Sequence, residues 1–227
     1  MECVEGNRIL LIKQVKRLQE KFSGFELAKS GSGNSVVKGN LNFSVAYCGK
    51  VIKDDYDVEI EIPDDYPQSP PTVREVGSKI PKDREFHVNT HDGTLCLGAP
   101  LAVKRTFAEQ RSLLWFVEKQ VVPFLFGISY KMKYGQFPFG ELSHGSKGLL
   151  EHYKELFAVK DDFVVLEFFR LLCVGSYDEH AMCPCGSGLK LRTCHRKILK
   201  KVRRQQRTEE FQQEYLGILI FLNNQLT

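Results

Sequence analysis

A cysteine among polar residues lies in the middle of the chain, in the stretch HVNTHDGTLCLG at positions 87–98. An accessible thiol that ionises is a nucleophile, and the thioester it forms reacts readily with amines. The Asp92-Gly93 pair predicts a turn directly before the cysteine, and the charged stretch 81–85 upstream is typical of an exposed loop. We therefore predict a partly exposed, reactive thiol at Cys96. The alternative is a buried core thiol, because a leucine stands on each side of it.

Three other polar side chains are candidates for proton transfer. His91 and Asp92 are close to Cys96 in the sequence, where they could deprotonate an incoming lysine or simply form a turn. His144 lies in a later loop, where it could act as an acid or base over the thiol or bond only to the backbone.

A second cluster of chemically active residues is the stretch CPCGSGLKLRTCH, which supplies Cys183, Cys185, Cys194 and His195. Three thiols and one imidazole are the donor set of structural zinc sites, and four protein ligands leave no position open for catalysis. The Gly-Ser-Gly turn between the two pairs allows the backbone to fold back and bring them together. The stretch resembles the SEC-C motif, so we predict a structural Zn²⁺ site.

Two motifs in the first half resemble ubiquitin-conjugating (E2) enzymes, and they occur in the same order. E2 enzymes carry a Tyr-Pro-x-x-Pro-Pro turn after a strand, and this chain has YPQSPP at 66–71. They then carry His-Pro-Asn and Gly-x-(Ile/Leu)-Cys-Leu, which are similar to His87-Val88-Asn89 and to 93–97. The resemblance covers roughly residues 7–126, with Val88 in place of the usual proline and a slightly shorter loop before the cysteine.

This resemblance implies an α+β fold, with an antiparallel four-stranded meander flanked by helices. It also implies that Cys96 carries the C-terminus of a ubiquitin-like protein as a thioester. Asn89 would stabilise the oxyanion or order the loop, and His87 would be structural. Together with the C-terminal motif, the chain resembles bacterial E2-like proteins of CBASS-type anti-phage defence operons. There the partner would be a nucleotidyltransferase.

The sequence contains neither a Gly-x-Gly-x-x-Gly loop nor a Walker-type lysine loop for carboxylate activation. Cys96 would therefore receive its acyl group from an E1-like activating enzyme or another activated donor. Two alternatives remain open. One is an inactive E2-like adaptor that binds proteins, and the other is a nucleic-acid-binding zinc protein.

Basic residues crowd positions 196–207, which we expect to begin a helix that runs toward Asn223. They could form a solvated helix face, meet an acidic protein, or meet nucleic acid. The basic stretch has no interleaved aromatic residues, which disfavours a nucleic-acid stacking surface.

Hydrophobic periodicity predicts the elements that position these residues. In the first half we expect a helix over 8–22, a turn over 30–35, strands near 41–45 and 56–62 joined by a turn at 48–50, and a short return strand over 73–76. In the second half we expect a helix capped by Thr106 that continues toward Val122, an ordered loop over 134–148, and helices over 148–157 and 163–173. These divide the chain into an E2-like domain (1–145), a helical extension (146–180) and a zinc knuckle with a basic helix (181–227).

Composition is ordinary for a globular protein, with 42% hydrophobic and 26% charged residues and a net charge of +4. The longest apolar run, 216–222, contains a glycine and is far below the ~18 residues that span a bilayer. The N-terminus lacks the basic-then-apolar pattern of a signal peptide. We therefore expect a cytoplasmic protein whose seven cysteines are reduced or metal-bound.

Overall fold

The computed structural model describes residues 2–29, 34–139, 143, 145–174 and 176–225. Most of the predicted turn at 30–35 and the whole of His144 lie outside these residues. The chain divides into two compact units, Met1–Glu141 and Leu142–Thr227. Each unit is described by itself below.

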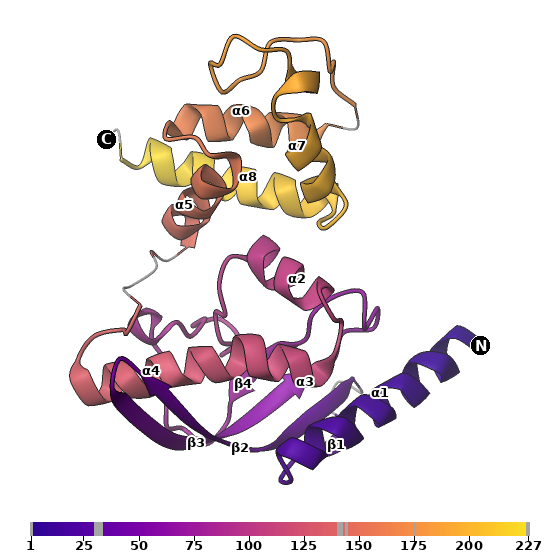
Figure 1. The fold of residues 1–227 in the computed structure, drawn as a ribbon, viewed down its shortest axis with the longest axis vertical. Coiled ribbons are helices and arrows are strands. Elements are labelled where there is room, and N and C mark those ends of the chain that lie inside the picture. The colour runs from indigo at the N-terminus through magenta and orange to yellow at the C-terminus, as the bar shows by residue number, and fades with distance from the viewer. Residues whose placement is uncertain (1, 30–33, 140–142, 144, 175, 226–227) are drawn as a thin grey trace. The chain divides into compact units, whose positions relative to one another are not determined.

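The first unit contains an antiparallel sheet in the order β1-β2-β3-β4 (Figure 1). The strands are β1 (Glu26–Lys29), β2 (Ser35–Tyr47), β3 (Lys50–Glu61) and β4 (Thr72–Glu75). The predicted α+β class with a four-stranded antiparallel meander is therefore confirmed. The sequence reasoning assigned no residues to β1, because its four residues are nearly all exposed and show no apolar alternation.

The long β2–β3 hairpin has a two-residue turn in which both residues have positive φ, 47° at Cys48 and 75° at Gly49. Such turns match the right-handed twist of the paired strands. Alternate side chains of β3, such as Tyr56, Val58 and Ile60, are buried, whereas the residues between them are more exposed. The sheet therefore has one core-facing side, as the sequence pattern predicted.

Helices pack on that core-facing side. Leu11, Val15 and Leu18 of α1 are buried with residues of the sheet in one hydrophobic core. The helices of this unit are α1 (Glu2–Lys21), α2 (Pro100–Ala108), α3 (Leu113–Phe116) and α4 (Val122–Tyr134), with a 3₁₀ turn η1 (Arg84–Phe86) and a π-helical turn η2 (Val117–Val121). The helix predicted over 8–22 is thus present and begins at Glu2.

The predicted helix start at Thr106 is wrong. Thr106 lies inside α2, which begins at Pro100, a residue whose fixed φ suits the first helical turn. The following helix begins instead after Ser112, whose hydroxyl accepts the Trp115 N–H at 3.5 Å. The π-helical turn comes directly before Pro123, which has no N–H for the normal helical bond.

The second unit is helical, with buried aromatic side chains at its centre. Its helices are α5 (Gly145–Phe157), α6 (Asp162–Cys173), α7 (Arg196–Arg203) and α8 (Thr208–Asn223), with a 3₁₀ turn η3 (Leu191–Thr193). The helices predicted over 148–157 and 163–173 are confirmed. The single helix expected from 196 to Asn223 is wrong, because α7 ends at Arg203 and an extended residue, Arg207, comes before α8 begins at Thr208.

The described part of the chain contains no helix with both the length and the apolar character needed to cross a membrane.

Candidate functional site

Cys96 ends a small hairpin that spans residues 87–96, which we call the Cys96 hairpin. The Asn89 N–H donates to the Thr94 carbonyl at 2.9 Å, and the Cys96 N–H donates to the His87 carbonyl at 2.8 Å. The hairpin is attached to β4 by a bond from the Leu95 N–H to the Val73 carbonyl at 2.7 Å. The sequence-predicted residues are therefore held on the edge of the main sheet.

Alternation along this hairpin separates its side chains into two sets. Val88 and Leu95 pair with each other and are buried, with 5% and 6% of their surfaces exposed. Neighbouring residues of a strand point to opposite faces, so Asn89, next to Val88, and Cys96, next to Leu95, share the other face. Cys96 itself is partly exposed. A partly exposed cysteine and an asparagine therefore lie on the same face of the hairpin.

Thr94, which the sequence reasoning missed, joins two of the predicted residues. Its hydroxyl accepts a bond from the Asn89 side-chain amide at 2.8 Å and donates to the Asp92 carboxylate at 2.7 Å. The same carboxylate oxygen accepts the Thr94 N–H at 3.0 Å. A threonine two residues after an aspartate in a turn was the available signal, because Asp side chains often bond to the backbone two residues on.

These bonds define what Asp92 can do. Hydrogen bonds from Thr94, with a smaller contribution from Arg74, lower the pKa of the Asp92 carboxyl below its ordinary value. A carboxylate with a lowered pKa is a weaker base. The arrangement therefore favours Asp92 as the residue that orders the turn. His91 is exposed in the same turn.

His87 is held by packing at the start of the hairpin. It has a left-handed backbone conformation with φ 54°, and its ring meets the Phe137 ring edge-on with 5.1 Å between centroids. Lys131 of α4 donates to the Glu85 carbonyl at 2.6 Å and lies 4.7 Å from the centre of the Phe137 ring. Contacts with α4 and Phe137 therefore hold the 3₁₀ turn η1 and the His87 ring at the start of the hairpin.

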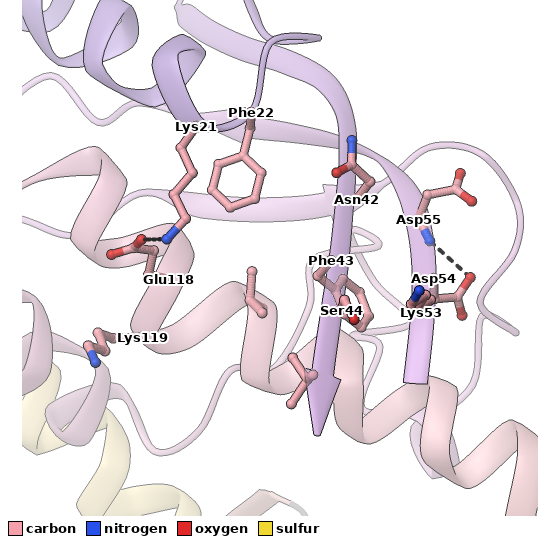
Figure 2. Close-up of a pocket in the computed structure, with 12 residues that line it drawn as sticks. Lys21, Phe22, Asn42, Phe43, Ser44, Lys53, Asp54, Asp55, Glu118 and Lys119 are labelled. Atoms are coloured by element: carbon pink, nitrogen blue, oxygen red, sulfur yellow. Dashed lines mark hydrogen bonds and ion pairs between the residues drawn. The ribbon is translucent and has the colours of Figure 1, made fainter. Parts of the chain in front are cut away.

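An open pocket of about 920 Å³ lies elsewhere in the same unit, between the end of α1, strands β2 and β3, and the π-helical turn (Figure 2). No residue of the Cys96 hairpin lines it. The pocket and the thiol are therefore separate features of the first unit.

The second unit brings the four predicted metal ligands together. One ligand atom from each of Cys183, Cys185, Cys194 and His195 lies within 4.8 Å of all the others. The Cys183 N–H donates to the Leu189 carbonyl at 2.9 Å and closes a tight loop. Gly186 and Gly188 in that loop have φ of 76° and 72°, a conformation that side chains disfavour.

The geometry fits a tetrahedral metal ion. The Nε2 of His195 lies 2.8 Å from the Phe157 carbonyl, which can only accept a hydrogen bond, so Nε2 carries the proton. The unprotonated Nδ1 then faces the thiols, 3.2 Å from Cys183 Sγ and 3.0 Å from Cys194 Sγ. A histidine oriented by a backbone carbonyl in this way is typical of metal centres.

Electrostatics at this cluster also favours a cation. Burial raises the pKa of the Cys183 thiol, and side-chain hydrogen bonding with Cys194 raises it further, although a backbone bond from Cys185 opposes the shift. The pKa of Cys185 is lowered despite burial, chiefly by hydrogen bonding with Ser187. Crowded thiols resist ionising together, and a divalent cation between them removes that repulsion.

Part of the basic stretch is used within the second unit. Arg196 and Lys200 of α7 both form ion pairs with Glu179, and Arg203 lies over the Tyr177 ring at 5.7 Å. Lys197 and Lys201 are exposed, and no carboxylate partner is recorded for them among the described residues. The run of positive charge therefore serves partly to hold α7 against the loop that precedes the metal ligands.

Comparison with protein families matches the SEC-C motif to residues 181–197, which include all four candidate ligands. No curated protein and no solved structure matches the chain. The match and the ligand cluster together indicate a metal site, for which zinc is the typical ion of this motif.

Proposed function

We propose that the first unit is an E2-like acyl carrier, in which Cys96 holds the C-terminal carboxyl group of a partner protein as a thioester. The observation that supports this most is the partly exposed Cys96 at the end of an ordered hairpin, on the same face as Asn89. The resemblance of 66–71 and 87–97 to E2 motifs adds the expected order along the chain.

The reaction begins when the Cys96 thiolate attacks the carbonyl carbon of an activated C-terminus, which an E1-like enzyme supplies as its own thioester. The new S–C bond forms, the bond to the activating enzyme's sulfur breaks, and that sulfur takes up the proton that Cys96 released. In the second step a lysine amine attacks the carbonyl carbon, an amide forms, and the Cys96 sulfur leaves as the thiol with the proton lost by the amine.

Asn89 is the residue that would stabilise the oxyanion. Its amide nitrogen carries two hydrogens, and one of them bonds to Thr94. The second is available for an oxygen that develops negative charge next to Cys96. Thr94 and Asp92 act through Asn89 as positioning residues, because they fix the orientation of its side chain.

The partner is a protein with a free, flexible C-terminus. By resemblance to bacterial E2-like proteins of CBASS-type defence operons, it is either a ubiquitin-like protein or the nucleotidyltransferase of the operon. We also propose that the metal of the second unit is a structural Zn²⁺, because four protein donors leave no position for a substrate.

The test is to express the protein together with the products of its neighbouring genes and to separate the cells' proteins on a non-reducing gel. We expect an adduct that disappears with a thiol reductant and in Cys96→Ala, and that Cys96→Ser converts into an ester resistant to the reductant.

Cys48→Ala is the matched control, because Cys48 is an exposed thiol in a turn far from the hairpin in sequence. It should leave the adduct unchanged. An adduct that is lost in Cys48→Ala and kept in Cys96→Ala contradicts the assignment. Full cellular function of Cys96→Ala would instead support the inactive adaptor.

A further inference from the structure

Strand β2 is paired along its whole length on one side only. It pairs with β3 from Val36 to Tyr47. On its other side it pairs with β1 only from Ser35 to Lys38. The last part of β2 is therefore an edge of the sheet, although β2 is the second strand in the order.

The register identifies which backbone groups are unpaired. Tyr47 and Lys50 face each other across a two-residue turn, so this pair exchanges both of its hydrogen bonds. In an antiparallel ladder such pairs alternate with pairs that exchange none. The N–H and C=O groups of Asn42, Ser44 and Ala46 therefore point away from β3, and no backbone partner is recorded for them in the described part of the chain.

The close approach of Gly39 to Gly24 explains why the pairing of β1 with β2 begins only at Glu26. A Cβ built on Gly39 would lie 2.7 Å from the Cα of Phe25, so the preceding segment crosses β2 at this point. Beyond the crossing, no described strand covers the edge.

The open pocket runs along this free edge. Four consecutive β2 residues line it, from Asn42 to Val45. Because consecutive residues face opposite sides of a sheet, a pocket touched by all four follows the edge of the strand. Figure 2 shows Lys21 and Phe22 on one side of the pocket and Asn42, Phe43 and Ser44 of β2 on the other. Partly buried Phe43, with Phe22, gives it an apolar floor.

The free edge lacks the proline and charged residues that usually prevent another strand from pairing with an exposed edge. The stretch from Asn42 to Tyr47 reads NFSVAY and contains no proline and no charged residue. Exposed edges without such residues readily accept another strand. The backbone therefore specifies the occupant as an extended polypeptide.

Charges around the pocket further define that polypeptide. Lys79 forms ion pairs with Asp54 and Asp55, and Lys21 forms one with Glu118. Each of the three acidic residues of the pocket lining thus has a lysine partner, and Asp54 and Asp55 share Lys79. The other two cations, Lys53 and Lys119, have no carboxylate partner recorded among the described residues, and Lys119 lies 5.0 Å from the Trp115 ring centre. The pocket is thus complementary to an acidic side chain.

We propose that the free edge of β2 between Asn42 and Ala46 binds an extended, acidic segment of a partner protein as an added strand. Main-chain hydrogen bonds to Asn42, Ser44 and Ala46 supply affinity. Alternate apolar side chains of the segment pack toward Phe43, and an Asp or Glu reaches Lys53 or Lys119. This docking surface does not include Cys96. The docking proposal can therefore be tested independently of the acyl-carrier proposal.

The probe is a phage-displayed library of random twelve-residue peptides, selected against the immobilised full-length protein. We expect enrichment of peptides with alternating apolar residues and at least one Asp or Glu. The enriched peptide, labelled with fluorescein, should bind Ser44→Pro at least about tenfold more weakly than the wild type. Proline at 44 removes a donor that points to the free edge and leaves the β2–β3 ladder intact.

Ser44→Ala keeps the N–H and is the matched control, with unchanged affinity expected. Lys53→Glu should also weaken binding, which keeps the test decisive if Ser44→Pro does not fold. Hydrogen exchange gives a second reading, in which the peptide slows the Ser44 and Ala46 amides, while those of Phe43 and Val45 are slow already. The proposal is overturned if no peptide is enriched, if Ser44→Pro and Lys53→Glu bind as well as the wild type, or if the edge only joins two copies of this chain.

Discussion

The backbone N–H of Cys96 donates a 2.8 Å hydrogen bond to the carbonyl oxygen of His87. His87 in turn packs against Phe137, which follows α4. The position of the thiol therefore depends on contacts between residues about fifty positions apart in the chain, and these contacts can be tested one by one.

The hydroxyl of Thr94 is predicted to make the main side-chain hydrogen bonds that stabilise the Cys96 hairpin. Thr94→Val keeps the shape but removes a hydroxyl that bonds to Asn89 and Asp92. Because Thr94 is buried, we expect a loss of about 1–2 kcal/mol in the free energy of unfolding. Urea denaturation followed by Trp115 fluorescence measures it. Thr90→Val, at an exposed position of the same turn, should change stability by less than about 0.5 kcal/mol.

The stability of the Cys96 hairpin should also depend on pH, through the carboxyl group of Asp92. The folded state lowers the pKa of Asp92 below 3.8, so its contribution to stability is complete above the unfolded-state pKa and is lost as the pH falls through the folded-state pKa. The effect should be small, because the carboxylate is largely exposed and screened by solvent.

The amide signal of Thr94 in NMR spectra is the measurement for this prediction. It should shift as the pH is lowered below about 4 in the wild type and should lose this titration in Asp92→Asn. Asp64→Asn, at an exposed carboxyl outside the hairpin, should leave it unchanged. Persistence of the Thr94 titration in Asp92→Asn would show that another group controls it.

Removal of the metal should unfold the second unit selectively. We expect one zinc per chain by elemental analysis, and we expect a strong chelator or Cys185→Ser to reduce the helical circular dichroism signal. Trp115 is the only tryptophan and lies in the first unit, so its fluorescence should stay unchanged. Cys173→Ser removes a thiol outside the cluster and should retain the zinc. Full zinc content in Cys185→Ser would disprove the ligand assignment.

The crossing at Gly39 predicts an unequal pair of glycine substitutions. A Cβ at residue 39 meets the backbone of Phe25 at 2.7 Å, so Gly39→Ala should cost about 3 kcal/mol or more. Gly49 has φ 75° and nothing within 4 Å of an added Cβ, so Gly49→Ala should cost only about 1–2 kcal/mol. Thermal melting of both variants distinguishes the two costs, and equal values would argue against the close crossing.

Local patterns predicted the parts of this protein whose contacts are close in sequence. The Cys183–His195 stretch closes on itself within thirteen residues, so its ligand types and glycines define the site without help from distant residues. The β2–β3 hairpin follows from apolar alternation and a Cys48-Gly49 turn. Its strands meet across two residues, and few arrangements of such a pattern bury the apolar side chains.

Other features depend on contacts that no local pattern specifies. Thr94 became part of the site only because the hairpin registers it opposite Asn89. The bond between the Asp92 carboxylate and Thr94 likewise exists only in the folded chain, and a role of Asp92 as a base stays a prediction. The capping pattern predicted one helix that starts at Thr106. The chain instead begins a helix at Pro100 and forms a π-helical turn before Pro123. The acyl-carrier role of Cys96 stays a prediction. The sequence alone determined which residues could do chemistry. Tertiary packing decided which of them share a face and which strand edge is free. The reason is that the burial of apolar side chains and the pairing of backbone groups depend on contacts from the whole chain.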